Sequence, residues 1–113
     1  MDKAIAAAKA QVAKSPGNPV FYNLLGNALF QLKGLPNVLD IRCVGLTGAI
    51  DMAPIAGSPG LRGWNAIEYS FHEAGIMLRL SGDCIELTPP LIISEDQIGE
   101  IVDKVGRTIK AVA

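Results

Sequence analysis

The sequence predicts an α+β fold, in which a helical hairpin precedes a small, mostly antiparallel sheet with helices packed on one face. Three observations lead to this prediction. The first 34 residues are rich in alanine and carry leucines at helical spacing. From residue 38 onward, β-branched and alternating runs replace that pattern. Helix signals then separate and follow the strand runs, which gives the order β-β-α-β-β-α.

The helical hairpin is expected in residues 1–34. DKAIAAAKAQVAK at 2–14 predicts a helix because alanine has the highest helix propensity, and SPGNP at 15–19 ends it because proline cannot continue a helix. A second helix is expected over 20–34. Four of its apolar residues share one face: Tyr22, Leu25, Leu29 and Leu32.

Four strands and one intervening helix are expected next. The strand-like runs are residues 38–45, 46–53, 76–80 and 84–88. Ser58 as N-cap and Pro59 in the first turn are expected to begin the helix, and Gly75 to end it. This helix carries an apolar series at helical spacing: Trp64, Ile67, Phe71 and Ala74.

The last helix has the strongest local signal. Ser94 and Gln97 match a capping box, and Ile93 with Ile98 matches the hydrophobic staple that often accompanies one. One apolar stripe follows: Ile98, Ile101, Val102, Val105, Ile109 and Val112. We therefore expect this helix to pack along the core.

Bulk properties narrow the class of protein. The 113 residues suit one domain, and a net charge of -1 gives no reason to expect nucleic-acid or membrane binding. No apolar run is long enough to cross a bilayer, and MDKAIAAAKA lacks a signal-peptide core, so a cytoplasmic location is expected. Cys43 and Cys84 lack metal-ligand spacing and are expected to be buried free thiols.

Few single residues suggest a catalytic or metal-binding site. His72 has Glu68 one helical turn before it and Glu73 beside it, an arrangement that a base or metal ligand would share. A histidine on the helix surface is favoured because no second ligand lies at matching spacing. Asp83 and Glu86 do not form an acid/base pair by sequence alone. No catalytic residue and no metal site are predicted.

Residues 35–113 carry several linked motifs. They include LKGLPNVLDIRCVGLTGAIDMAP, which begins just before this range, then GSPGLRGW and EAGIMLRLSGDCIELTPPLIISEDQI. Together these resemble the C-terminal small domain of class III, pyridoxal-phosphate-dependent aminotransferases of the ω-amino acid:pyruvate type. In the string MLRLSGD, Arg79 matches the arginine with which that family binds the substrate carboxylate. A guanidinium can grip a carboxylate with two parallel hydrogen bonds. The alternative is an ordinary strand arginine facing solvent.

The resemblance implies a cofactor that this chain is not expected to hold alone. In the family, a lysine of the large domain forms a Schiff base with pyridoxal phosphate. The lysines here are Lys3, Lys9, Lys14, Lys33, Lys104 and Lys110, and none lies in such a motif. We expect an inactive part of an enzyme that closes the active site and binds carboxylate. It would pair with a missing large domain or self-associate. The alternative is a structural or interaction module without a substrate.

The first 34 residues resemble a different family. The spacing is similar to that of a tetratricopeptide-repeat hairpin at six positions: Ala4, Pro16, Tyr22, Leu25, Gly26 and Leu29. The string ALFQLKGLPNV fits both that pattern and the aminotransferase one. We therefore hypothesise a chimera, natural or engineered, joined between residues 28 and 34, with domains 1–34 and 35–113.

Overall fold

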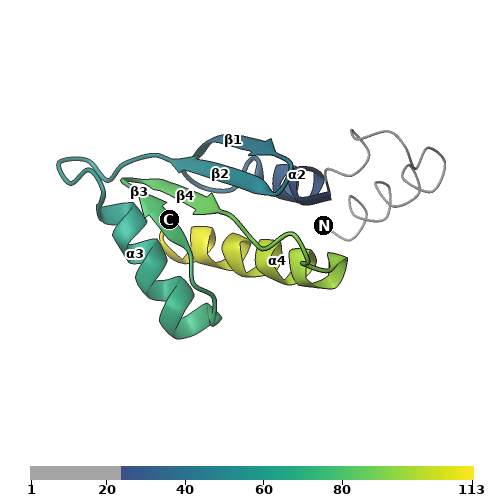
Figure 1. Ribbon diagram of the computed structural model, residues 1–113. Helices are drawn as coiled ribbons and strands as arrows, with labels where there is room; N and C mark the ends of the chain where they lie inside the picture. The colour runs from purple at the N-terminus through teal and green to yellow at the C-terminus, as the bar shows by residue number, and fades with distance from the viewer. Residues whose placement is uncertain (1–23) are drawn as a thin grey trace.

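The computed structural model describes residues 24–113, and Figure 1 shows them as a twisted sheet with helices below and behind it. In chain order the elements are α2 (Leu24–Leu29), the 3-10 turn η2 (Phe30–Leu32), β1 (Val38–Val44), β2 (Thr47–Met52), α3 (Leu61–Tyr69), the π-helical turn η3 (Ser70–Ala74), β3 (Arg79–Ser81), β4 (Cys84–Leu87) and α4 (Glu95–Ala111). The predicted α+β class and the order β-β-α-β-β-α are confirmed. The helix expected at 2–14 and the turn after it lie outside the described residues.

The sheet has the strand order β1-β2-β4-β3, and every neighbouring pair is antiparallel. One row of side chains crosses all four strands. Ile41 lies opposite Ile50, Ile50 opposite Ile85, and Ile85 opposite Leu80. Ile50 and Ile85 are fully buried. Because side chains alternate between the faces of a sheet, this row defines the core side, and the residues between them define an open side.

Helix α4 covers the core side of the sheet (Figure 1). Its capping box is confirmed, since the Ser94 hydroxyl accepts from the Gln97 amide at 3.2 Å and the Gln97 side chain accepts from the Ser94 amide at 3.0 Å. Four residues of the predicted stripe are buried: Ile98, Val102, Val105 and Ile109. The apolar periodicity of this helix therefore matches its buried face.

Helix α2 ends earlier than the sequence suggested, because regular helix gives way to a 3-10 turn after Leu29. Leu25, Leu29 and Leu32 are nonetheless buried as the spacing predicts, and they belong to the same core cluster as the sheet. Gly106 of α4 permits this approach, since a Cβ there would lie 3.1 Å from Leu32 Cδ2. The tetratricopeptide-like hairpin and the boundary at residue 34 remain predictions, because residues 1–23 are outside the described part.

Helix α3 differs from the expectation at its beginning and on its buried face. It begins at Leu61, with Gly60 as N-cap at a φ of 88°, rather than with Ser58 as N-cap. The buried residues of α3 and η3 are small: Gly63, Ala66, Ser70 and Ala74. Trp64 and Phe71 are 59% and 55% exposed. The small side chains form the packed face, while Trp64 and Phe71 point outward and Ile67 is only partly buried. Gly75 ends the helical segment in the left-handed conformation, as predicted.

Candidate functional site

Arg79 is the first residue of β3, which is an edge strand of the sheet. It lies directly opposite Glu86 of β4, and its Nε is 3.4 Å from Glu86 Oε2. Since the next residue, Leu80, faces the core row, Arg79 projects from the open side. Its side chain is 76% exposed. Arg79 therefore presents a guanidinium to solvent with one carboxylate beside it.

Arg42 lies in the same cross-strand row and has a different environment. The register aligns Arg42 with Ala49, Ala49 with Glu86, and Glu86 with Arg79. Arg42 binds two carboxylates. Its Nη1 is 3.1 Å from Asp40 Oδ2, its Nη2 is 3.2 Å from Asp51 Oδ1, and its Nη1 also contacts the other oxygen of Asp51. Two carboxylates thus surround Arg42, whereas Arg79 has one longer contact, to Glu86 at 3.4 Å.

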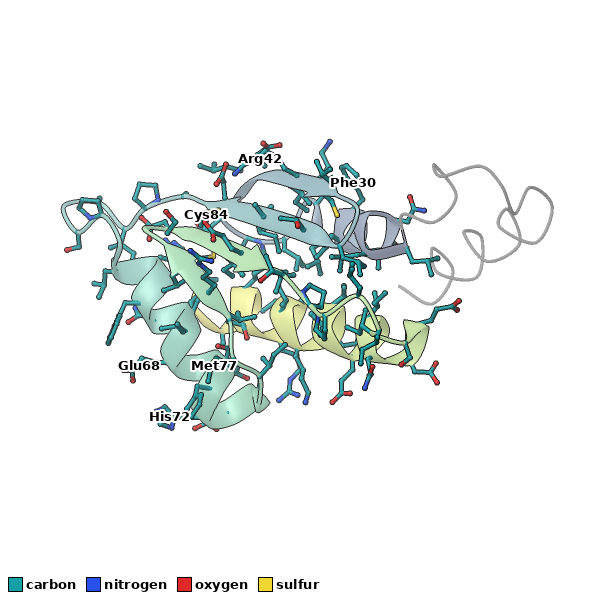
Figure 2. All side chains as sticks on the ribbon, in the orientation of Figure 1. Phe30, Arg42, Glu68, His72, Met77 and Cys84 are labelled. Atoms are coloured by element: carbon teal, nitrogen blue, oxygen red, sulfur yellow. The ribbon has the colours of Figure 1, made fainter. Side chains whose placement is uncertain are left out.

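Cys84 belongs to the cluster around Arg42, and Figure 2 shows both on the upper side of the sheet, away from α4. Partial burial, together with the nearby Asp51 carboxylate, raises the pKa of Cys84 to about 11. The Arg42 hydrogen bonds hold the pKa of Asp51 below its usual value. Burial also raises the pKa of Cys43. Neither cysteine is in a disulfide, and both are partly, not fully, buried. Neither is set up as a nucleophile at neutral pH, because that role needs a lowered pKa.

His72 lies in η3 at the far end of the α3 segment, on the same exposed surface as Glu68 and distant from Arg42 and Cys84 (Figure 2). Its ring packs edge-on against Phe71 at a centroid distance of 5.2 Å. Across residues 24–113, no three histidine, cysteine or acidic side chains come close enough to hold a metal ion. In the same residues, no helix is long and apolar enough to cross a membrane.

Asp83 has a position that the sequence did not reveal. It lies in the turn between β3 and β4, and its carboxylate accepts hydrogen bonds from the amides of Gly60 and Gly63, at 2.8 and 2.9 Å. The Gly63 amide is one that a local N-cap side chain would normally bind, and the Gly60 amide belongs to the N-cap residue, where the N3 side chain of a capping box would bind it. The only signal in the sequence was an aspartate in a Ser-Gly-Asp turn, which does not indicate a distant helix.

Comparison with known proteins places this fold in a family. No family model matches the chain. The omega-aminotransferase of Caulobacter vibrioides is 35% identical over 83 residues, which are 74% of this chain and 19% of that protein. The beta-alanine–pyruvate aminotransferase of Pseudomonas aeruginosa is 33% identical over 85 residues, which are 75% of this chain and 19% of that protein. This chain is a class III aminotransferase homologue. It corresponds to a C-terminal-like fragment and spans about a fifth of these relatives.

The fold of the aminotransferase fragment also matches a solved member. The crystal structure of a thermostable omega transaminase from Pseudomonas jessenii, a 6-fold mutant, superposes with a TM-score of 0.74 at 25% identity. The alignment covers 99% of this chain and 24% of that one. The sheet that carries Arg79 is therefore an aminotransferase sheet.

Pyridoxal phosphate, the family's cofactor, does not fit the groove of this fragment. A groove of about 280 Å³ lies between the end of η3, the loop before α4, and α4 itself. It is lined by Gly75, Ile76, Pro90, Ile93, Gln97, Glu100, Ile101 and Lys104. Lys104 Nζ is 2.9 Å from Glu100 Oε1, so the lysine already has a carboxylate partner. A phosphate in this groove would meet the Glu100 carboxylate, and the remaining lining is mainly apolar.

Proposed function

We propose that this chain is one part of an ω-aminotransferase-type enzyme, and that it closes one side of the active site and binds the substrate carboxylate through Arg79. The observation that carries the proposal is the contrast between two arginines in one row. Arg42 is occupied by Asp40 and Asp51, whereas Arg79 has a single contact through Nε and is 76% exposed. The homology to aminotransferases supports the same reading.

The chemistry follows from the shape of the guanidinium. The contact of Arg79 with Glu86 is through Nε, which leaves its two terminal amino groups available to grip a carboxylate with parallel hydrogen bonds. Glu86 offsets the positive charge when no substrate is present. An incoming carboxylate replaces that weak contact by a stronger one. The residues of this chain thus bind and orient the substrate, and no step of amino transfer is assigned to them.

Exposed apolar side chains support the reading as part of a larger enzyme. Leu91 and Ile92, in the loop before α4, are 88% and 92% exposed, and Met77 is 77% exposed. Adjacent exposed apolar residues of this size usually mark a surface that another protein surface covers. We propose that the missing part of the enzyme covers it, and that the isolated chain self-associates. A chain that sediments as a monomer at all concentrations would instead favour the stand-alone structural module.

The isolated chain is proposed to bind no pyridoxal phosphate and to lack transaminase activity. The test is incubation with pyridoxal phosphate, reduction with borohydride and mass analysis. The expected result is no lysine labelled at stoichiometric yield. Complete labelling of one lysine, for example Lys104, would contradict this part of the proposal.

The carboxylate role is tested in a reassembled enzyme. The full chain is produced together with the Caulobacter vibrioides omega-aminotransferase from which the matching 83-residue segment has been removed. Activity is expected only when both are present. Replacing Arg79→Gln should raise the KM for pyruvate about tenfold or more, since a hydrogen bond to a charged group contributes about 1.5–3 kcal/mol.

The matched control is Arg107→Gln, which removes an exposed arginine of α4. It should leave the KM unchanged. An Arg79→Gln enzyme with the KM of the unchanged one would refute the carboxylate role. Failure of the two parts to assemble would favour the stand-alone module.

A further inference from the structure

The turn between β3 and β4 is tied to two other parts of the fold, the beginning of α3 and the end of β2, through one residue, Asp83. Its carboxylate oxygens accept from the Gly60 amide at 2.8 Å and the Gly63 amide at 2.9 Å. Its backbone carbonyl accepts from the Met52 amide, at the end of β2, at 3.0 Å. A hairpin turn at the edge of a sheet would otherwise be held only by its own strands.

The turn and α3 pack so closely at Gly63 that no side chain fits between them. A Cβ at Gly63 would lie 2.1 Å from the Gly82 carbonyl oxygen and 3.2 Å from Asp83 Cα. The first of these distances is far inside van der Waals contact and involves rigid backbone. The beginning of α3 therefore rests directly on the turn, and the glycine at 63 is what allows the Asp83 carboxylate to reach the amides.

The same turn follows directly on the strand that carries Arg79. Strand β3 has three residues, Arg79–Ser81, and pairs with β4 only. The chain reaches it from η3, where the Ile76 amide bonds the Ser70 carbonyl at 2.8 Å and Leu78 is buried. The helical segment and β3 thus form a loop, joined at one end by the chain and at the other by Asp83.

We infer that Asp83 is the positioning residue for Arg79: by binding the amides of α3, it closes this loop and fixes where the guanidinium stands on the open side of the sheet. The inference rests on the proposed carboxylate role of Arg79. An anionic carboxylate suits the task because it accepts from two amides at the positive end of a helix. Asparagine at 83 has one acceptor oxygen and would turn an amide group toward a donor. Asp83 itself does not contact substrate.

The first test follows β3 by hydrogen exchange in the full chain. Asp83→Asn is compared with Asp103→Asn, which makes the same change of charge at an exposed position of α4. The expected result is faster exchange, by about tenfold, of the β3 and β4 amides in Asp83→Asn, because a hydrogen bond to a charged group is lost. Exchange in the middle of α4 and in β1 should not change. Equal exchange of β3 in the unchanged chain and in Asp83→Asn would overturn the inference.

The second test measures binding of pyruvate, a small carboxylate, by NMR titration of the unchanged chain and of three variants: Arg79→Gln, Asp83→Asn and the double variant. Asp83→Asn should weaken binding severalfold on its own and have no further effect when Arg79 is already replaced. An equal loss in both backgrounds, or no loss in Asp83→Asn, would overturn the positioning role.

The two proposals fail in different ways. If Arg79→Gln binds pyruvate as the unchanged chain does, or if the unchanged chain does not bind it, the carboxylate role of Arg79 fails in this chain, and hydrogen exchange alone decides whether Asp83 fixes β3. If Arg79→Gln loses binding and Asp83→Asn keeps it, the carboxylate role stands and the positioning role falls.

Discussion

Arg42 and Asp51 lie on neighbouring strands and form a two-point ion pair on the open side of the sheet, with Arg42 Nη2 3.2 Å from Asp51 Oδ1. Cys84 of β4, the strand that pairs with β2, lies beside them, with its Sγ 3.9 Å from Arg42 Nη2. The thiol therefore experiences two opposite influences. Asp51 disfavours the thiolate and Arg42 favours it. The pKa of Cys84 is raised because burial and Asp51 together outweigh Arg42.

The first prediction concerns the reactivity of Cys84. Replacing Asp51→Asn removes a negative charge and releases Arg42, so the pKa of Cys84 should fall from about 11. More thiolate is then present at pH 8, and alkylation of Cys84 by iodoacetamide should be several times faster. Asp40→Asn is the matched control, because Asp40 also binds Arg42 but does not act on Cys84. Equal rates in the two variants would contradict this account.

The second prediction concerns acid. Arg42 lowers the pKa of Asp51 in the folded chain below its ordinary value of 3.8. The stabilisation is therefore fully present above that value and is lost as the pH falls through the folded-state pKa. The unchanged chain should melt slightly above Asp51→Asn at pH 7, and the two melting temperatures should converge as the pH drops below about 4. A difference that does not shrink as the pH falls below 3.8 would show a cause other than charge.

The third prediction compares two helical glycines. Gly63→Ala should destabilise the fold by at least about 2 kcal/mol, because its Cβ would overlap the rigid Gly82 carbonyl. Gly106→Ala should lie within about 1 kcal/mol of the unchanged chain, since the gain in helix propensity offsets a 3.1 Å contact with the flexible Leu32 side chain. Urea unfolding of both variants measures the difference. Similar values would mean that α3 can move away from the turn.

The fourth prediction concerns the row of isoleucines. Ile50 is fully buried between Ile41 and Ile85, so Ile50→Ala should cost about 2–5 kcal/mol in the free energy of unfolding. Val44→Ala, at an 83% exposed position of β1, should cost less than about 0.5 kcal/mol. Chemical denaturation of the two variants checks this. A loss of free energy of unfolding in Ile50→Ala as small as that in Val44→Ala would imply that the sheet and α4 pack loosely.

Local signals predicted the elements that depend on local chemistry. The capping box at Ser94, the terminator at Gly75 and the stripe on α4 were read correctly, because each depends on residues within a few positions of one another. The strands were found as well, with ends shifted by a few residues where turns begin. The family motif singled out Arg79, but its role as a carboxylate ligand remains a prediction.

Features that depend on register or distant partners were missed. The cap of α3 was assigned to Ser58, but Asp83, more than twenty positions later, binds the first amides and Gly60 is the N-cap. Nothing in the local sequence encodes that pairing. The outward position of Trp64 was also unexpected, because helical spacing alone does not say which apolar face a sheet will accept when a face of small residues is also present.

The strand order has a practical consequence for division of the chain. Strands β2 and β4 pair with each other, although the loop at 53–60, the α3 segment and β3 lie between them in the chain. Ala56 and Gly57 of this loop are exposed. A cut between these two residues separates β1 and β2 from β3 and β4, so each piece keeps one hairpin and loses the central pairing. Neither piece retains the complete isoleucine row. Pieces 1–56 and 57–113 should therefore be unfolded when separate and should fold when they bind each other. If each piece were fused to a different protein, formation of the sheet would report that the two proteins are close together.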